Sequence, residues 1–274
     1  MRWLPLALAL SLASAPMGLM AGLMARRMVG PDDAVGPGIA VAAAADLQHV
    51  MPELAEGFRR ATGRPVTVTY GSSGNFFSQI QNGAPFDLFF SADIEYPRRL
   101  ATDGLVEPGS LVEYATGRIV LWSRKDRALK VGGGLAALLD AGVRRIAIAN
   151  PDHAPYGRAA VAALQHQHLY ERVVGKLVRG ENVAQAAQFV ESGNADAGII
   201  ALSLALAPGL KERGLYYEVP ETFHPPITQA AVVIRASRHK DGARAFLASL
   251  RTPEAVRLMQ ANGFRLSAPG VPAR

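Results

Sequence analysis

A turn rich in hydroxyl groups, Tyr70–Asn75, holds the residues of this sequence best suited to binding chemistry. Its two glycines permit the tight backbone that joins a strand to a helix. Ser72, Ser73 and Asn75 present hydroxyl and amide groups where a helix leaves its first N–H groups unpaired. Such a corner can bind an anion, and neutral donors would hold it because the turn contains no Lys or Arg. An ordinary helix N-cap is the alternative interpretation.

A second loop, Asn150–Gly157, offers similar groups. Its two prolines restrict the path of the backbone. Gly157 can open the next helix and leave further N–H groups free, and Tyr156 can place its phenolic hydroxyl in a cleft. The alternative for Tyr156 is a ring that packs on the loop with its hydroxyl in water.

Strand and helix patterns alternate around these turns. Short apolar runs predict buried strands, and apolar residues at helical spacing predict helices. Pro52 removes one helical hydrogen bond, so its helix either starts late, with Pro52 in the first turn, or bends there. The alternation predicts an α/β fold with a mainly parallel sheet in the first half. The predicted strands are 39–45, 66–70, 86–91, 118–123, 145–149, 197–200, 215–219 and 229–234. The predicted helices are 47–63, the segment after the serine turn to about 83, 95–102, 158–168, 183–191, 241–250 and 253–262. Gly132–Gly134 is predicted to be a loop.

Ligands of open α/β sheets bind beyond the carboxyl ends of the strands. In this chain those ends are the turns after the strands that finish near Ala45, Tyr70, Ala149 and Ile200. The polar or backbone candidates near these turns are Asp46, Ser72, Ser73, Tyr156 and Asn182 or Val183.

We predict two lobes, because the chain can cross over near 115–117 and return near 225–228. Residues 38–116 with 228–274 form the first predicted lobe, and 117–227 form the second. Residues 1–37 are predicted to be an export signal and a flexible lead-in, since a basic start precedes an apolar run and a small-residue site. The run, Trp3–Ala25, is also long enough for a membrane anchor, so the segment is either cleaved or retained.

Composition excludes several classes of function. The net charge of +6 comes from single or paired basic residues, and no basic-aromatic stripe points to nucleic acid. The chain has no cysteine, which excludes disulfides, thiolate catalysis and thiolate metal sites. The chain has 274 residues, of which 49% are hydrophobic, so it can form one large core or two smaller ones.

The sequence gives little support for an enzyme. Asp152 and His153, with Asp46, could do acid–base work in a hydrolase or transferase, but a histidine that stabilises its loop is the simpler interpretation. His166 and His168 lack the i, i+4 spacing of a helical zinc pair. The serine turn has neither the Gly-x-Ser-x-Gly elbow nor the Gly-Lys-Ser/Thr of a phosphate-binding loop. We therefore predict a binding protein.

Five ordered motifs resemble those of the periplasmic molybdate-binding proteins of ABC importers, the ModA family. The resemblance runs from about Ile39 to Leu266. Its motifs are Ile39-Ala-Val-Ala-Ala-Ala-Ala-Asp46, Tyr70-Gly-Ser-Ser-Gly-Asn75, Gln79-Ile-Gln-Asn-Gly-Ala-Pro-Phe-Asp-Leu-Phe-Phe-Ser-Ala-Asp93, Asn150-Pro-Asp-His-Ala-Pro-Tyr-Gly157 and Gly198-Ile-Ile-Ala-Leu-Ser203.

The resemblance implies a two-lobe, type II periplasmic binding protein fold with the ligand cleft between the lobes. It implies that molybdate or tungstate, bound as the oxyanion and without a cofactor, is delivered to an ABC permease in the inner membrane. We expect a periplasmic monomer. The implied ligand-binding residues are Ser73, through its hydroxyl and N–H, and the backbone at Asp46, Tyr156 and Val183. These residues would hold the molybdenum or tungsten through the oxygens of the oxyanion. Further candidates are Ser72, Asn75, Gly157 and Asn182.

Two residues depart from the family pattern. Asp46 stands where the family often has Ser, and Ala201 stands where it often has a ligand Tyr, a phenol that Tyr156 is expected to replace. A carboxylate about 4 Å from a dianion would be repelled by roughly 8 kcal/mol at an effective dielectric constant near 20. We therefore expect the Asp46 side chain to turn away and cap the following helix, unless it is protonated. Another oxyanion or a small organic anion is the alternative ligand.

Overall fold

The β-strands form two separate sheets in the computed structural model, which describes residues 38–127 and 129–266. The predicted export signal lies outside the described residues. The first sheet has the strand order β11-β4-β10-β3-β1-β2. Its strands are β1 (Ile39–Ala44), β2 (Val66–Gly71), β3 (Leu88–Ser91), β4 (Val112–Gly117), β10 (Ile227–Val233) and β11 (Arg265–Leu266).

The first sheet is mixed rather than mainly parallel. β1 runs parallel to β2 and β3, with Val41 level with Val68 on one side and Leu88 on the other. β10 returns antiparallel to both β3 and β4, and β11 pairs antiparallel with β4. The parallel arrangement predicted for the first half of the chain is confirmed for β1, β2 and β3, and the antiparallel pairs all involve the strands of the returning segment, β10 and β11.

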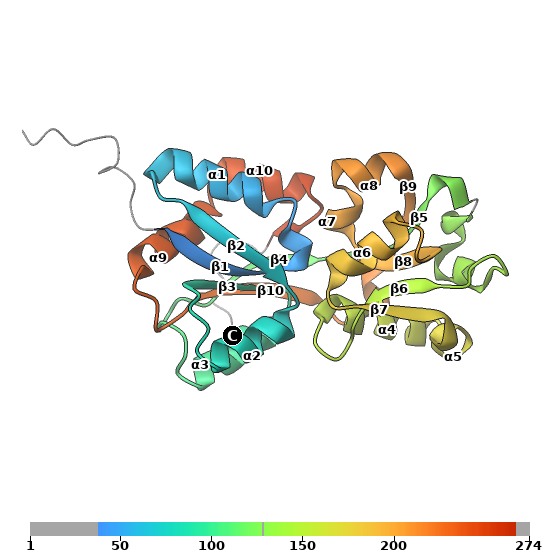
Figure 1. The fold of residues 1–274 in the computed structure, drawn as a ribbon, viewed down its shortest axis with the longest axis horizontal. Coiled ribbons are helices and arrows are strands. Elements are labelled where there is room, and N and C mark those ends of the chain that lie inside the picture. Colours follow the sequence, from blue (N-terminus) through green and yellow to red (C-terminus); the bar gives the residue numbers. More distant parts are fainter. Residues whose placement is uncertain (1–37, 128, 267–274) are drawn as a thin grey trace, which may run out of the picture. The chain divides into compact units, whose positions relative to one another are not determined.

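Helices cover both faces of this sheet (Figure 1). Side chains along β1 alternate between the faces, so that Val41 packs with Met51 and Phe246 while Ala42 packs with Phe76 and its neighbours. The helices of the first cluster are α1 (Met51–Thr62), α9 (Lys240–Ser249) and α10 (Pro253–Ala261), and those of the second are α2 (Ser73–Gln81) and α3 (Glu95–Thr102).

Local signals explain where α1 begins and ends. A short 3-10 turn, Ala45–Leu47, follows β1, and α1 begins afterwards with Pro52 in its first turn. The late start is thus confirmed. Gly63 ends the helix in a left-handed conformation (φ 73°) that favours glycine, and its N–H donates to the carbonyl of Arg59.

The second sheet has the order β7-β6-β8-β5-β9. β6 lies parallel to β7 and β8, while β5 runs antiparallel to β8 and β9. Its strands are β5 (Ile119–Arg124), β6 (Ile146–Ala149), β7 (Leu177–Gly180), β8 (Ala197–Ala201) and β9 (Gly214–Glu218), and its helices are α4 (Pro155–His166), α5 (Tyr170–Val173), α6 (Val183–Glu191), α7 (Leu202–Ala205) and α8 (Pro208–Arg213).

Two predicted segments of this region need correction. α4 begins at Pro155 rather than Arg158, since proline needs no N–H partner in the first turn of a helix. The glycine-rich segment predicted as a loop lies in a 3-10 stretch, Val131–Leu139, that is interrupted at Gly134. None of the helices in the described part of the chain has the length and apolar character that a bilayer span requires.

Candidate functional site

Three helices, α2, α4 and α6, begin at one small cavity. The volume of this cavity is about 10 Å³, which is close to the minimum that holds a single water. As it stands, the cavity has room for about one water. Its lining consists of Ala44, Ala45, Asp46, Gly71, Ser72, Ser73 and Ala92 from the segments of the first sheet, and Ala154, Pro155, Tyr156, Asn182 and Val183 from those of the second.

Six of the eight predicted site residues line this cavity. The two others lie elsewhere: the Asn75 side chain is exposed, and Gly157 packs against the end of β6, where an added Cβ would lie 2.2 Å from the carbonyl oxygen of Ala149. The lining contains no Lys or Arg among its described residues. A bound anion would therefore depend on neutral donors.

The helix starts supply those donors. Ser73 and Val183 are the first residues of α2 and α6, and Tyr156 is the second residue of α4. N–H groups in the first turn of a helix have no carbonyl partner within the helix, and the helix dipole makes this end electropositive. Three such ends at one cavity form an arrangement that favours an anion.

The caps of two of these helices are side chains of the lining. The Ser72 hydroxyl accepts a hydrogen bond from the N–H of Asn75 at 3.3 Å. The Asn182 side chain accepts from the N–H groups of Ala184 and Gln185, both at 3.0 Å. Since these two side chains satisfy N–H groups deeper in the helix, the N–H of the first helical residue is left for other partners.

Ser73 is fully buried and already has one partner. Its Oγ accepts a hydrogen bond from the N–H of Ala92 at 2.9 Å. This bond uses the oxygen as acceptor and leaves the hydroxyl proton available. Ser73 can therefore donate both its O–H and its N–H to a ligand.

The Asp46 side chain does not cap the following helix, so that expectation is wrong. It is completely buried, and its Oδ2 accepts hydrogen bonds from the Tyr156 hydroxyl at 2.9 Å and from Nε2 of Gln229 at 2.6 Å. The 3-10 turn that contains Asp46 has no side-chain cap. The hydrogen bonds from Tyr156 on α4 and Gln229 on β10 replace a cap bond to nearby backbone N–H groups, because these two donors reach the carboxyl inside the core.

Burial raises the pKa of Asp46 to about 6, and the hydrogen bonds from Gln229 and Tyr156 offset part of that effect. Burial and the neighbouring Asp46 carboxyl hold the pKa of Tyr156 well above its usual value. Tyr156 therefore stays protonated and donates to the carboxyl in the structure, rather than keeping its hydroxyl free for a ligand.

A buried polar network behind Asp46 was not predicted. Gln229 also donates to the Tyr156 hydroxyl at 3.0 Å, and its Oε1 accepts from the Tyr114 hydroxyl at 2.7 Å. The Ser203 hydroxyl donates to the backbone carbonyl of Asp46 at 2.8 Å. The only sequence signal for Gln229 is a polar residue inside the apolar strand β10, and its partners are far away in the chain.

His153 joins its loop to the serine turn. Its Nδ1 lies 2.8 Å from the Ser72 hydroxyl oxygen, its Nε2 lies 3.1 Å from Nδ2 of Asn150, and its carbonyl accepts from the N–H of Gly74 at 2.9 Å. Asp152 is exposed and does not complete a catalytic group with it. Because Ser72 caps α2, this serine–histidine pair is a structural contact.

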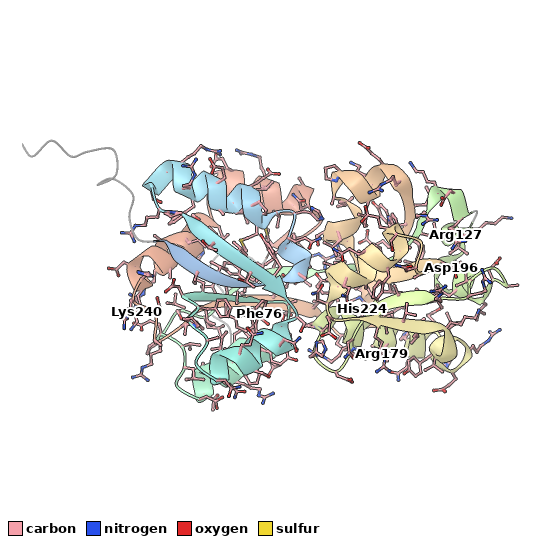
Figure 2. All side chains as sticks on the ribbon, in the orientation of Figure 1. Phe76, Arg127, Arg179, Asp196, His224 and Lys240 are labelled. Carbon is pink, nitrogen blue, oxygen red and sulfur yellow. The ribbon has the colours of Figure 1, made fainter. Side chains whose placement is uncertain are left out.

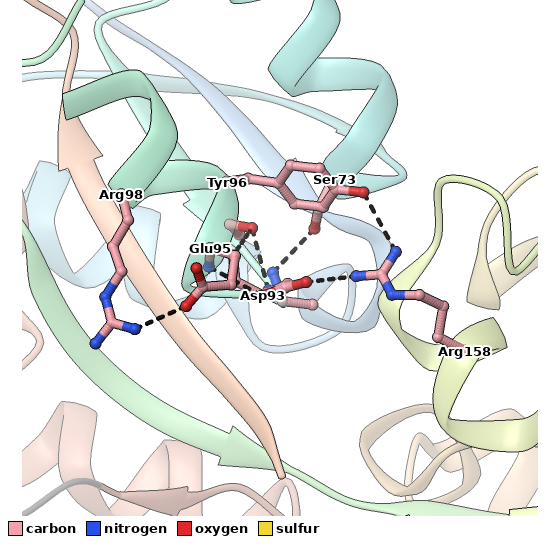
Figure 3. A network of polar contacts seen from close by, with 8 residues as sticks. Ser73, Asp93, Glu95, Tyr96, Arg98 and Arg158 are labelled. Carbon is pink, nitrogen blue, oxygen red and sulfur yellow. Dashed lines mark hydrogen bonds and ion pairs between the residues drawn. The ribbon is translucent and has the colours of Figure 1, made fainter. Parts of the chain in front are cut away.

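A second contact joins α4 to the segment that follows β3 (Figure 3). The guanidinium of Arg158, on α4, pairs with the carboxylate of Asp93 and donates to the Tyr96 hydroxyl at 3.2 Å. Both charged partners are partly exposed. Among the described residues, no cluster of three or more His, Asp or Glu side chains could hold a metal ion.

Residues 39–265 match the family of bacterial extracellular solute-binding proteins, and the chain belongs to this family. A solved periplasmic molybdate-binding protein of Azotobacter vinelandii superposes with a TM-score of 0.79 at 35% identity, covering 84% of this chain and 100% of that one. The two-lobe binding-protein fold predicted from the motifs is confirmed by this match.

Two relatives carry the comparison further. The chain is 39% identical over 228 residues to the molybdate-binding protein ModA of A. vinelandii, covering 83% of this chain and 90% of that protein. It is 37% identical over 226 residues to the ModA of Rhodobacter capsulatus, covering 82% and 87%. The resemblance to the ModA family is thus confirmed.

Proposed function

We propose that this protein captures molybdate or tungstate outside the inner membrane and delivers it to an ABC transporter permease. The observation that carries the proposal is the small cavity at the starts of α2, α4 and α6, lined by neutral donors. Both relatives described above are molybdate-binding proteins, and the neutral donors of the cavity suit an anion.

The ligand contacts follow from the donors available. Ser73 would donate its hydroxyl and N–H, and the backbone N–H groups of Asp46, Tyr156 and Val183 would complete the set. Ser72 and Asn182 would act by capping their helices, because their side-chain oxygens already accept from backbone N–H groups. Hydrogen bonds to a charged acceptor are stronger than neutral ones, so a few buried donors suffice to hold an oxyanion.

Opening and closing of two lobes would admit and enclose the ligand. We assign residues 38–116 with 228–274 to one lobe and 117–227 to the other. The contacts from His153 to Ser72 and from Arg158 to Asp93 join segments of the two proposed lobes, so they would form on closure. A monomer in the periplasm, exported by its N-terminal segment and without enzymatic activity, fits this role.

Isothermal titration calorimetry with molybdate, tungstate, sulfate and phosphate tests the proposal. Molybdate and tungstate should bind the wild type, and Ser73→Ala should weaken both. Ser78→Ala, an exposed serine of the same helix, is the matched control and should bind like the wild type. Equal binding of sulfate, or failure of molybdate to bind the folded protein, would refute the assignment; preference for phosphate would support the alternative of another oxyanion.

A further inference from the structure

Asp46 differs from the other buried acidic residues of the described chain. Asp196 accepts from the backbone N–H groups of Arg144 and Arg145 and pairs with Arg127 at 2.6 Å (Figure 2). Asp87 accepts from the N–H of Ala40 and from the Ser237 hydroxyl, one on each oxygen. Both of these carboxyls therefore use both oxygens.

Asp46 uses only one oxygen. Its Oδ2 has two donors, but its Oδ1 is buried and has no hydrogen-bond partner among the described residues. The residue also lines the cavity. An unpaired buried carboxylate oxygen costs free energy unless it gains a proton or a donor.

Within the described part of the chain, the groups that face this carboxyl carry no positive charge. Tyr156 on α4 and Gln229 on β10 donate to it, Ser203 on α7 donates to its backbone carbonyl, and Tyr114 on β4 stands behind Gln229. An ionised Asp46 at about 4 Å from a dianion would oppose binding by roughly 8 kcal/mol. That is about the whole binding free energy of a micromolar ligand.

We propose that the site binds its oxyanion together with one proton, which Asp46 carries on Oδ1 and donates toward the ligand. The proton comes from solvent when the anion binds, and it converts the unpaired oxygen from an acceptor into a donor. Oδ2 keeps its bonds from Tyr156 and Gln229. This inference rests on the proposed function and adds to it a side chain that makes affinity depend on pH.

The pH range follows from the free carboxyl. Burial raises the pKa of Asp46 to about 6 in this structure, so the carboxyl is mainly protonated below pH 6 and mainly ionised above it. Affinity should therefore be nearly constant at acidic pH and fall as pH rises, approaching tenfold per unit. Between pH 6 and pH 8 the dissociation constant should rise about fiftyfold.

Calorimetry of the purified full-length protein with sodium molybdate tests this, at pH 6, 7 and 8 and in two buffers of different ionisation enthalpy. The wild type should take up about one proton per anion at pH 8. Asp46→Asn should take up none, bind with little dependence on pH, and bind more tightly than the wild type at pH 8. Asp152→Asn, an exposed acid on the neighbouring loop, is the control and should behave like the wild type.

The outcomes separate this inference from the proposed function. Molybdate binding by the wild type without proton uptake and with a constant affinity would overturn the inference and leave the function standing. Tight binding of phosphate without proton uptake, lost in Asp46→Asn, would also overturn it, since Asp46 would then stay ionised and accept the ligand's own proton. Failure of folded wild type to bind any of the four anions would refute both. The wild-type proton count stands even if the variant does not fold.

Discussion

Gly74 lies where the serine turn contacts the loop that contains His153, and a methyl group there should prevent this contact sterically. A Cβ built on Gly74 would lie 2.6 Å from the carbonyl oxygen of His153, 2.8 Å from the Tyr96 hydroxyl and 2.9 Å from the His153 Cβ. One of these atoms is backbone and cannot swing aside. Gly74→Ala should therefore hold the two segments apart by obstructing the bond from the Gly74 N–H to His153.

The same substitution should not harm the helix that carries it. Alanine is favoured over glycine inside a helix by up to about 1 kcal/mol, so the ligand-free protein should unfold no more easily than the wild type. Overpacking in a closed contact costs about 1–3 kcal/mol. At 1.4 kcal/mol per tenfold change, molybdate affinity should fall about 5- to 150-fold.

Calorimetry with molybdate and thermal unfolding without ligand measure the two effects. Gly57→Ala is the matched control, since Gly57 is also helical and its added Cβ would meet nothing closer than a guanidinium nitrogen of Arg60 at 4.0 Å. The reasoning is refuted if Gly74→Ala binds as tightly as Gly57→Ala. It is also refuted if affinity falls only in step with a loss of stability.

Three further predictions concern the same site. Burial raises the pKa of Asp46 from 3.8 to about 6, so the stability that the protonated carboxyl retains is fully present only below pH 4 and is lost as pH rises through 6. At 1.36 kcal/mol per unit, the stability of Asp46→Asn relative to the wild type should increase by about 2 kcal/mol between pH 4 and pH 8 in urea unfolding without ligand. Arg158→Ala removes a partly exposed ion pair with Asp93, so molybdate should dissociate only a few-fold faster in stopped-flow measurements, and the difference should shrink at high salt. Ser73→Ala leaves the buried N–H of Ala92 unpaired and should lower the free energy of unfolding by about 1–3 kcal/mol in urea.

Each of these has a contrary result. A relative stability of Asp46→Asn that does not change with pH would mean that the buried carboxyl is not destabilised by ionisation. An effect of Arg158→Ala that persists unchanged at high salt would point to packing rather than charge. Ser73→Ala with wild-type stability would show that another group pairs with the Ala92 N–H.

The sequence by itself determined the parts of this protein that depend on near neighbours. The strand-turn-helix around Ser72 follows from glycines and a capping hydroxyl within a few residues, and the late start of α1 follows from Pro52. The alternation of strands and helices predicted the fold class. Six residues predicted near the turns at strand ends line the cavity. Three strands without a clear pattern, β4, β7 and β11, were missed.

Only the tertiary structure decided how the buried polar groups are paired. Gln229 reaches Asp46 across 183 positions and Tyr156 reaches it across 110, and no periodicity or cap encodes such distances. A side chain near a turn will cap a helix unless packing brings it better donors, and packing did so for Asp46. The physical reason is range: caps and periodicity act over one or two turns, while burial depends on which elements meet, and burial sets the charge of the carboxyl in the cavity.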